Sequence, residues 1–194
     1  MIKSKSNSDL AKSKAAWRRR LLRTRGAMGD EQRRTAAEKI RERLLSLEAV
    51  PAAEVVFCFI SYGSEVDTHP LLHSLLAGGK TLLVPKIIGR ERMIAVPLHN
   101  WHDLAPGQLG ILTPTGNEEW TGRTDVCITP GLGFTTTGKR LGFGRGYYDQ
   151  WFAAHPDGMR IAVAFECQLV PDLPVDRYDM PVNTIVTERR IISV

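Results

Sequence analysis

Cysteine is scarce in this chain and follows no pattern. The three cysteines, Cys58, Cys127 and Cys167, are far apart and lie in or beside apolar runs. Dispersed thiols in odd number argue against a disulfide framework, and no paired cysteines suggest a structural zinc site. Such thiols suit a reducing compartment, so we expect a cytoplasmic protein.

Long hydrophobic runs are also missing. No apolar stretch approaches the roughly 18 residues that suggest a membrane span, and the residues before Trp17 lack the hydrophobic centre of a secretory signal. With 194 residues, 43% of them apolar, the chain can build one α/β domain. We expect residues 1–10 to form a loose polar tail, residues 11–194 to form a single domain, and the protein to be a monomer without a membrane partner.

Two common catalytic signatures do not occur. The sequence has no G-x-S-x-G, so a hydrolase nucleophile elbow is unsupported. His69 and His73 are four residues apart, but the glutamate of a zinc-protease helix is absent. Histidines that pack on a helix or face solvent are the simpler interpretation.

The net charge of +5 is unevenly placed: basic residues are concentrated between Lys12 and Arg43, whereas the rest of the chain is close to balanced. One interpretation is a nucleic-acid-binding arm. The other is a pair of amphipathic helices with solvated basic faces, because apolar residues recur at helical spacing from Ala36 to Leu47. Since Trp17 is the only aromatic residue in this segment, we favour helices and expect no nucleic-acid partner.

Short apolar runs alternate with helix-like segments along the rest of the chain. The four runs are Val55–Ile60, Thr81–Pro85, Asp125–Pro130 and Arg160–Phe165. A helical segment, THPLLHSLLAGGK, separates the first two runs. The alternation predicts a mainly parallel sheet with helices on both faces, a Rossmann-like three-layer α/β domain with a helical N-terminus. Ligands of such sheets bind beyond the carboxyl ends of the strands. The structure of residues 93–122 is left undecided, and WHDLAPGQLGILTPTG within them looks like a loop-rich connection.

The stretch RLGFGRGYYD, Arg140–Asp149, places glycine at every second position. Its backbone could form a nest for phosphate, with a helix starting near Tyr147 or Tyr148. A tight turn that needs glycine for positive φ angles is the competing interpretation. The dinucleotide fingerprint fails because Tyr147 stands where its third glycine belongs, and the P-loop fails because Arg140 follows Lys139. The residues alone therefore leave both interpretations open.

Taken together, the segments resemble the family of 5-formyltetrahydrofolate cyclo-ligase, also called methenyltetrahydrofolate synthetase. The resemblance covers most of the chain and rests on KAAWR, YGSEVDTHPLL, LVPK, Met93, WHDLAPGQLGILTP, TPGLGFTTTGKRLGFGRGYYD and CQLVPDLPVDRYDMPVNTIVTE, in this order. It implies ATP- and Mg²⁺-dependent cyclisation of 5-formyltetrahydrofolate, with or without a polyglutamate tail, to 5,10-methenyltetrahydrofolate. ADP and phosphate would be released after phosphorylation of the formyl oxygen and attack by N10.

The resemblance also implies roles for individual residues. Lys14 and Arg18 match contacts with ATP phosphates, and Asp149 and Asp179 match Mg²⁺ ligands, while Lys14, Arg140 and Asp149 are the candidate catalytic residues. The matching ATP loop consists of Arg140, Leu141, Gly142, Phe143, Gly144, Arg145, Gly146, Tyr147 and Tyr148. Without the resemblance, the favoured interpretations are an acid at a helix start for Asp149 and a turn residue before Pro181 for Asp179.

The folate side is assigned in the same way. The implied substrate residues are Tyr62, Glu65, Asp67, Met93 and the loop residues Phe143, Gly144, Arg145, Gly146 and Tyr147, and Trp101 offers further apolar surface. Glu65 and Asp67 both remain candidates for the carboxylate that reads the pterin. The resemblance favours Asp67, whose competing interpretation is a helix cap. Arg145 and Asn183 depart from the family pattern. A nucleic-acid-binding module and a nucleotide-binding relative acting on another small molecule remain alternative functions.

Overall fold

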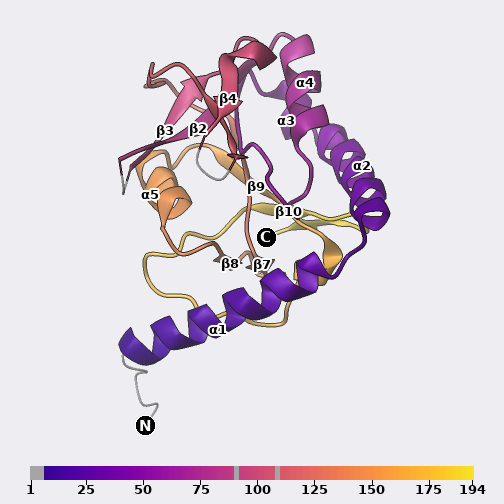
Figure 1. Cartoon of the computed structure of the whole chain (residues 1–194), viewed down its shortest axis with the longest axis vertical. Coiled ribbons are helices and arrows are strands. Elements are labelled where there is room, and N and C mark those ends of the chain that lie inside the picture. Colours follow the sequence, from indigo (N-terminus) through magenta and orange to yellow (C-terminus); the bar gives the residue numbers. More distant parts are fainter. Residues whose placement is uncertain (1–6, 90–91, 108–109) are drawn as a thin grey trace.

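A central sheet organises the protein (Figure 1). The computed structural model describes residues 7–89, 92–107 and 110–194. Within them, the sheet has the order β11-β10-β9-β6-β1-β2-β3, formed by Ile191–Ser193, Thr184–Val186, Met159–Val163, Val126–Thr129, Val55–Cys58, Thr81–Ile88 and Arg92–Pro97 respectively. Strands β10, β9, β6, β1 and β2 are parallel, whereas β3 and β11 join the two edges antiparallel. The sheet is therefore mainly parallel, as predicted.

Helices and two small ribbons complete the fold. The helices are α1 (Asn7–Gly26), α2 (Asp30–Ser46), α3 (Ala49–Ala52), α4 (His69–Ala77) and α5 (Tyr147–Ala154), with 3-10 turns η1 (Trp101–Asp103) and η3 (Glu166–Gln168). Strands β4 (Leu104–Pro106) and β5 (Leu112–Pro114) pair with each other, as do β7 (Gly133–Phe134) and β8 (Arg140–Leu141).

Alternate side chains of the central strands bury against opposite layers. Val56 and Cys58 of β1 belong to the cluster that contains buried residues of α2 and α4. Phe57, between them, packs with Trp151 and Phe152 of α5. Since successive side chains on a strand face opposite sides, this pattern produces the three layers visible in Figure 1, with α2 and α4 on one side and α5 on the other.

Helix α1 crosses the end of the molecule where β7 and β8 lie (Figure 1). Leu21 of α1 is buried in a small cluster with Leu132, Leu141 and Leu173. Burial of one such side chain stabilises by about 1.5–3 kcal/mol. A side chain at Gly133 would meet the Leu21 side chain at 2.6 Å, so glycine permits the close approach. This packing holds the basic face of α1 beside the glycine-rich stretch.

The structure corrects one expectation about local structure. Helix α1 begins at Asn7, so residues 7–10, which the sequence assigned to a loose tail, are helical, and residues 1–6 of that tail lie outside the described residues. The stretch that the sequence left undecided begins within strand β3 (Arg92–Pro97), which pairs antiparallel with β2. Where the chain is described, no helix is long and apolar enough to cross a membrane.

Candidate active site

A cavity of about 570 Å³ lies between α1, the glycine-rich loop and the start of α5. Its lining includes Lys14 and Arg18 from α1, Arg140 from β8, every residue from Gly142 to Gln150, and Asp176, Tyr178 and Asp179 from the segment before β10. The fold thus brings together cationic side chains from two distant segments and two aspartates that the sequence assigned to a metal.

The glycine loop, Gly142–Gly146, has a conformation that side chains would obstruct. Gly144 has φ +106°, and a Cβ there would lie 3.0 Å from the Arg18 guanidinium carbon. Gly146 has φ +71° and precedes the first turn of α5. The Arg18 Nε donates a hydrogen bond to the Gly142 carbonyl at 2.9 Å. The positive φ angles are what the tight-turn interpretation requires, and phosphate binding by the loop stays a prediction.

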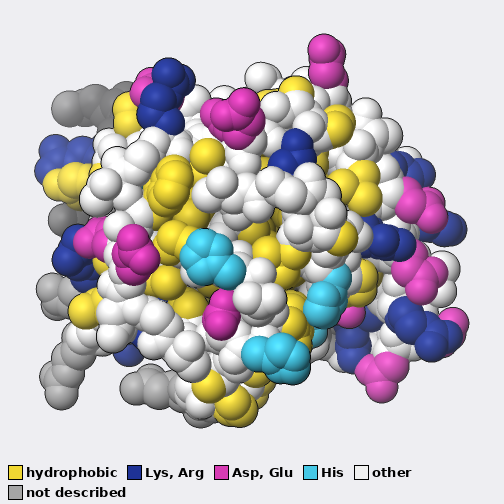
Figure 2. Space-filling view, turned by 90° about the horizontal axis from the view of Figure 1, so that it is seen from above, with side chains coloured by type: hydrophobic (Ala, Val, Ile, Leu, Met, Phe, Trp, Pro, Cys, Tyr) yellow, Lys and Arg dark blue, Asp and Glu magenta, His cyan; other side chains and the backbone are white. Residues whose placement is uncertain are grey.

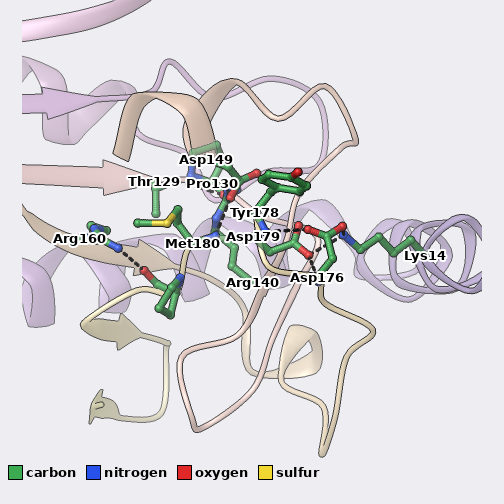
Figure 3. Close-up of polar contacts among 12 residues, drawn as sticks. Lys14, Thr129, Pro130, Arg140, Asp149, Arg160, Asp176, Tyr178, Asp179 and Met180 are labelled. Atoms are coloured by element: carbon green, nitrogen blue, oxygen red, sulfur yellow. Dashed lines mark hydrogen bonds and ion pairs between the residues drawn. The ribbon is translucent and has the colours of Figure 1, made fainter. Parts of the chain in front are cut away.

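Arg140 and Asp149 form a largely buried ion pair in the cavity wall. One Nη of Arg140 donates to Asp149 Oδ1 at 2.6 Å, and the side chains are 3% and 20% exposed. The same carboxylate oxygen accepts the Met180 N–H at 3.1 Å. Asp149 therefore joins three segments, β8, α5 and the chain after Asp179, as the close-up shows (Figure 3).

Lys14 reaches from α1 to a pair of carboxylates (Figure 3). Its Nζ donates to Asp176 at 2.7 Å and to Asp179 at 2.5 Å. Burial lowers the pKa of Lys14, but the bonds to Asp176 and Asp179 outweigh this effect and leave that pKa raised. The bond from Lys14 is also the main reason that the pKa of Asp176 is lowered. Lys14 is thus charged and anchored at the cavity.

Asp149 and Asp179 fit a magnesium site in their donor chemistry. Each uses one oxygen in the contacts above, whereas Asp149 Oδ2 and Asp179 Oδ1 accept no hydrogen bond from the described residues. Hard carboxylate oxygens, with phosphate and water as further ligands, are what Mg²⁺ prefers. Across 7–89, 92–107 and 110–194, no group of three or more His, Cys, Asp or Glu residues is arranged to hold a metal. A metal here would therefore depend on ligands from a bound phosphate.

A second cavity, of about 640 Å³, lies beside the loop after β1. Tyr62, Glu65 and Asp67 all line it, together with residues of α2. Glu65 is half-buried and accepts the Tyr62 N–H at 3.0 Å, and burial is the main cause of its raised pKa. Asp67 is exposed and accepts the His69 N–H at 3.0 Å, at the start of α4. Asp67 therefore supports the helix start, and Glu65 is the more deeply placed carboxylate.

Other predicted residues lie away from these cavities or face outward. Leu141 is buried in the Leu21 cluster, and Met93 packs beside Phe57, so neither is among the residues that line the two cavities. Trp101 stacks on His73 with ring centroids 4.2 Å apart. Histidines gather among hydrophobic side chains on the face seen in Figure 2. Arg145 lines the first cavity and is exposed.

Sequence reasoning missed two charged residues. Asp176 holds Lys14, and its only signal was its position three residues before Asp179 in the motif VDRYD. Arg25 is buried at the end of α1 and donates to Ser64 Oγ at 3.1 Å. It was grouped with the solvated basic residues because its spacing from Lys14 and Arg18 matched no motif.

Comparison with known proteins identifies the relatives of this chain. The sequence profile of the 5-formyltetrahydrofolate cyclo-ligase family matches residues 10–188, a range that includes every residue lining both cavities. The chain belongs to the 5-formyltetrahydrofolate cyclo-ligase family. The resemblance inferred from the sequence motifs is thereby confirmed.

Individual members of the cyclo-ligase family align over most of their length. The 5-formyltetrahydrofolate cyclo-ligase of Escherichia coli K12 is 30% identical over 174 residues, covering 86% of this chain and 96% of that protein. The enzyme of Mus musculus is 28% identical, covering 79% and 86% respectively. The chain is accordingly an enzyme of the ligase class.

Solved structures show the same fold. The NMR structure of 5,10-methenyltetrahydrofolate synthetase from Aquifex aeolicus superposes with a TM-score of 0.83 at 32% identity, covering 93% of this chain and 92% of that one. A Mycoplasma pneumoniae synthetase reaches a TM-score of 0.72 at 22% identity and supports the fold alone. The three-layer α/β architecture is therefore that of solved family members.

Proposed function

We propose that this protein catalyses the ATP- and Mg²⁺-dependent cyclisation of 5-formyltetrahydrofolate to 5,10-methenyltetrahydrofolate. The observation that carries the proposal is the convergence of Lys14, Arg18 and Arg140 on one cavity at the start of α5. Cationic side chains and free N–H groups at a helix start are suited to phosphate oxygens. Family membership directs this phosphate-binding capacity to a folate reaction.

The proposed chemistry explains the need for ATP. A formamide oxygen is a poor leaving group, so the γ-phosphoryl group first moves from ATP to the formyl oxygen and ADP forms. N10 then attacks the activated carbon and loses its proton, the carbon–oxygen bond breaks, and phosphate leaves. Positioning and charge neutralisation supply most of the catalysis in phosphoryl transfer.

The chain's own residues would supply that positioning. Arg18 and Arg140 face the glycine loop, where backbone and guanidinium N–H groups can orient the phosphates. Lys14 lies beside them with its charge fixed by two aspartates. When bound at Asp149 and Asp179, Mg²⁺ would neutralise charge on the phosphate oxygens.

The second cavity is the proposed folate side. The Glu65 carboxylate can accept hydrogen bonds from the amino and ring N–H groups of the pterin, while Tyr62 offers aromatic surface to the ring. The wall of this cavity formed by α2 carries Arg33, Arg34 and Arg41 together with Glu38. The carboxylates of a polyglutamate tail on the substrate would have to compete with the acidic side chains of this wall for its arginines.

We also propose that the protein acts as a cytoplasmic monomer without a nucleic-acid partner. Three of the basic residues of the α1 segment, Lys14, Arg18 and Arg25, are bonded to other segments of the protein. On α2, Arg33 and Arg34 pair with Asp30 and Glu31. On the face in Figure 2, seen from the side away from α1, basic and acidic side chains are interspersed. A Lys or Arg that is bonded within the protein is less available to neutralise a nucleic-acid phosphate.

Absorbance at the methenyl-folate band tests the proposed function. Purified protein is mixed with 5-formyltetrahydrofolate, ATP and Mg²⁺, beside samples lacking ATP or Mg²⁺. A rise that requires both confirms the reaction. ATP binding without any rise would refute the folate acceptor and favour a nucleotide-binding relative acting on another small molecule.

A further inference from the structure

Arg25 is a buried cation with few partners. The residue is 4% exposed, and its only hydrogen bond to the described residues runs from Nε to Ser64 Oγ at 3.1 Å. No carboxylate of the described chain forms an ion pair with it. Burial lowers the pKa of Arg25, which expresses the unfavourable free energy of placing the charge there. Because burying a charge with so little compensation costs free energy, the place of Arg25 points to a purpose other than stability.

The position of Arg25 suggests that purpose. Its guanidinium lies 5.8 Å from the ring centre of Phe143, which lines the glycine-loop cavity. On its other side it bonds Ser64, the neighbour of Glu65, which lines the second cavity. The described residues that line the two cavities do not overlap. Arg25 therefore contacts a residue that lines one cavity and the sequence neighbour of a residue that lines the other.

We propose that Arg25 is a positioning residue that fixes the Ser64–Glu65 segment against Phe143, so that a folate held by Glu65 meets the phosphate bound at the glycine loop. The inference rests on the proposed function, because it takes Glu65 as the pterin acceptor. The hydrogen bond to Ser64 sets the geometry, and the cation–π contact with Phe143 links that geometry to the ATP side. Arg25 does not need to touch either substrate.

The charge of Arg25 has a second effect on Glu65. Burial raises the pKa of Glu65, and the Tyr62 N–H and the Arg25 charge partly counteract that rise. Other charged or titratable groups around Glu65 or its cavity are Tyr148 of α5, Asp30, Arg33, Arg34, Glu38 and Arg41 of α2, and Asp67 and His69 at the start of α4. Removing Arg25 would raise the pKa of Glu65 further. Folate binding needs the ionised carboxylate in this proposal. As the pH falls, the variant without Arg25 would therefore lose folate binding at a higher pH than the unsubstituted protein does.

Steady-state kinetics over a range of pH tests the proposal. The variants are Arg25→Ala and Arg25→Lys, with Arg23→Ala as the control because Arg23 is exposed on the same last turn of α1. We expect Arg25→Ala to raise KM for 5-formyltetrahydrofolate about tenfold, the size of losing one hydrogen bond to a charged group. The KM for ATP should change less than twofold, which corresponds to about 0.4 kcal/mol, because Arg25 reaches the ATP side only through its contact with Phe143.

The pH profile separates positioning from simple destabilisation. In Arg25→Ala the acid limb of kcat/KM for the folate should move to higher pH, and Arg25→Lys should restore the limb because it keeps the charge. An unshifted acid limb, or equal rises in both KM values, would overturn the proposal. If Arg25→Ala does not fold, Arg25→Lys alone tests the proposal. Its acid limb of kcat/KM must stay at the pH of the unsubstituted protein, and its KM for 5-formyltetrahydrofolate must be raised.

Failure of the inference and failure of the proposed function give different results. Normal turnover by the unsubstituted protein together with unchanged kinetics of Arg25→Ala removes only the role of Arg25. No turnover by the unsubstituted protein refutes the cyclo-ligase reaction, and the role of Arg25 in it falls as well.

Discussion

Arg140 donates to Asp149 at 2.6 Å, and this ion pair ties strand β8 to the first turn of α5 at the wall of the glycine-loop cavity. The guanidinium is the more deeply buried partner, and its Nε has no hydrogen-bond partner among the described residues. The pair therefore supports the local structure as well as presenting an oxygen of Asp149 to the cavity. Any change at Asp149 should affect both stability and turnover.

We predict that Asp149→Asn abolishes Mg²⁺-dependent turnover and also destabilises the fold. The amide is a poor ligand for Mg²⁺, and the buried Arg140 would lose its counter-charge, which for buried pairs costs about 3 kcal/mol or more. Chemical denaturation and Mg²⁺ titrations of activity measure the two effects. Asp157→Asn is the control because Asp157 is exposed beyond α5 and lines neither cavity. Normal turnover by Asp149→Asn would remove Asp149 from the metal site.

The Lys14–Asp176 pair should make stability depend on pH. The pKa of Asp176 is lowered mainly by Lys14, so the folded state favours the ionised carboxyl. Its contribution is present above the ordinary Asp pKa of about 3.9 and disappears as the pH falls through the lower folded value. We expect Asp176→Asn to reduce the free energy of unfolding at pH 7. This difference should disappear only once the pH is below the lowered folded pKa of Asp176, where the carboxyl is protonated in both the folded and the unfolded state.

Urea unfolding of both proteins at several pH values, in EDTA so that no metal contributes, measures this difference. Asp172→Asn is a suitable comparison, because Asp172 pairs with Lys139 and is far more exposed than Asp176. A difference between Asp176→Asn and the unsubstituted protein that is constant with pH would show that the ion pair is not its source.

The strands, the parallel sheet and the family were predictable from the sequence because their signals are local. Apolar runs of strand length mark β1, β2, β6 and β9, and the family motifs are contiguous blocks. The antiparallel edge strand β3 was not predictable, since its pairing with β2 depends on a turn without a clear signature. The early start of α1 was also missed, because the polar segment from Asn7 to Leu10 resembles a tail in composition.

Roles that arise from tertiary contacts were harder to predict. Asp176 and Arg25 are distant in sequence from the partners that they hold, and neither lies at a spacing that a motif describes. Leu141 shows that a place in a motif does not fix where a side chain points. It lies inside the glycine-rich block, yet its side chain points to the Leu21 cluster, because residues on a strand alternate between faces.

The two candidate pterin carboxylates should respond differently to neutralisation. We expect Glu65→Gln to raise KM for 5-formyltetrahydrofolate by about 10- to 100-fold, the range for losing a charged hydrogen-bond partner. Asp67→Asn should change that KM less than threefold, since its carboxylate mainly accepts the His69 N–H at the start of α4. Steady-state kinetics with saturating ATP measures both variants. A larger effect of Asp67→Asn would reverse the assignment.

Tyr148 offers a test of the packing beneath the cavity. Its hydroxyl is buried and has no hydrogen-bond partner among the described residues, and burial raises its pKa. The ring lies between Phe57 and Phe152, with centroids 6.1 and 6.0 Å away. An unpaired buried hydroxyl costs about 1–3 kcal/mol, so Tyr148→Phe should raise the free energy of unfolding by about 1 kcal/mol. Tyr178→Phe, at an exposed position, should leave it unchanged. Urea unfolding measures both variants. A loss of stability in Tyr148→Phe would mean that the hydroxyl is paired in solution and that apolar contacts alone do not hold Tyr148 in the core.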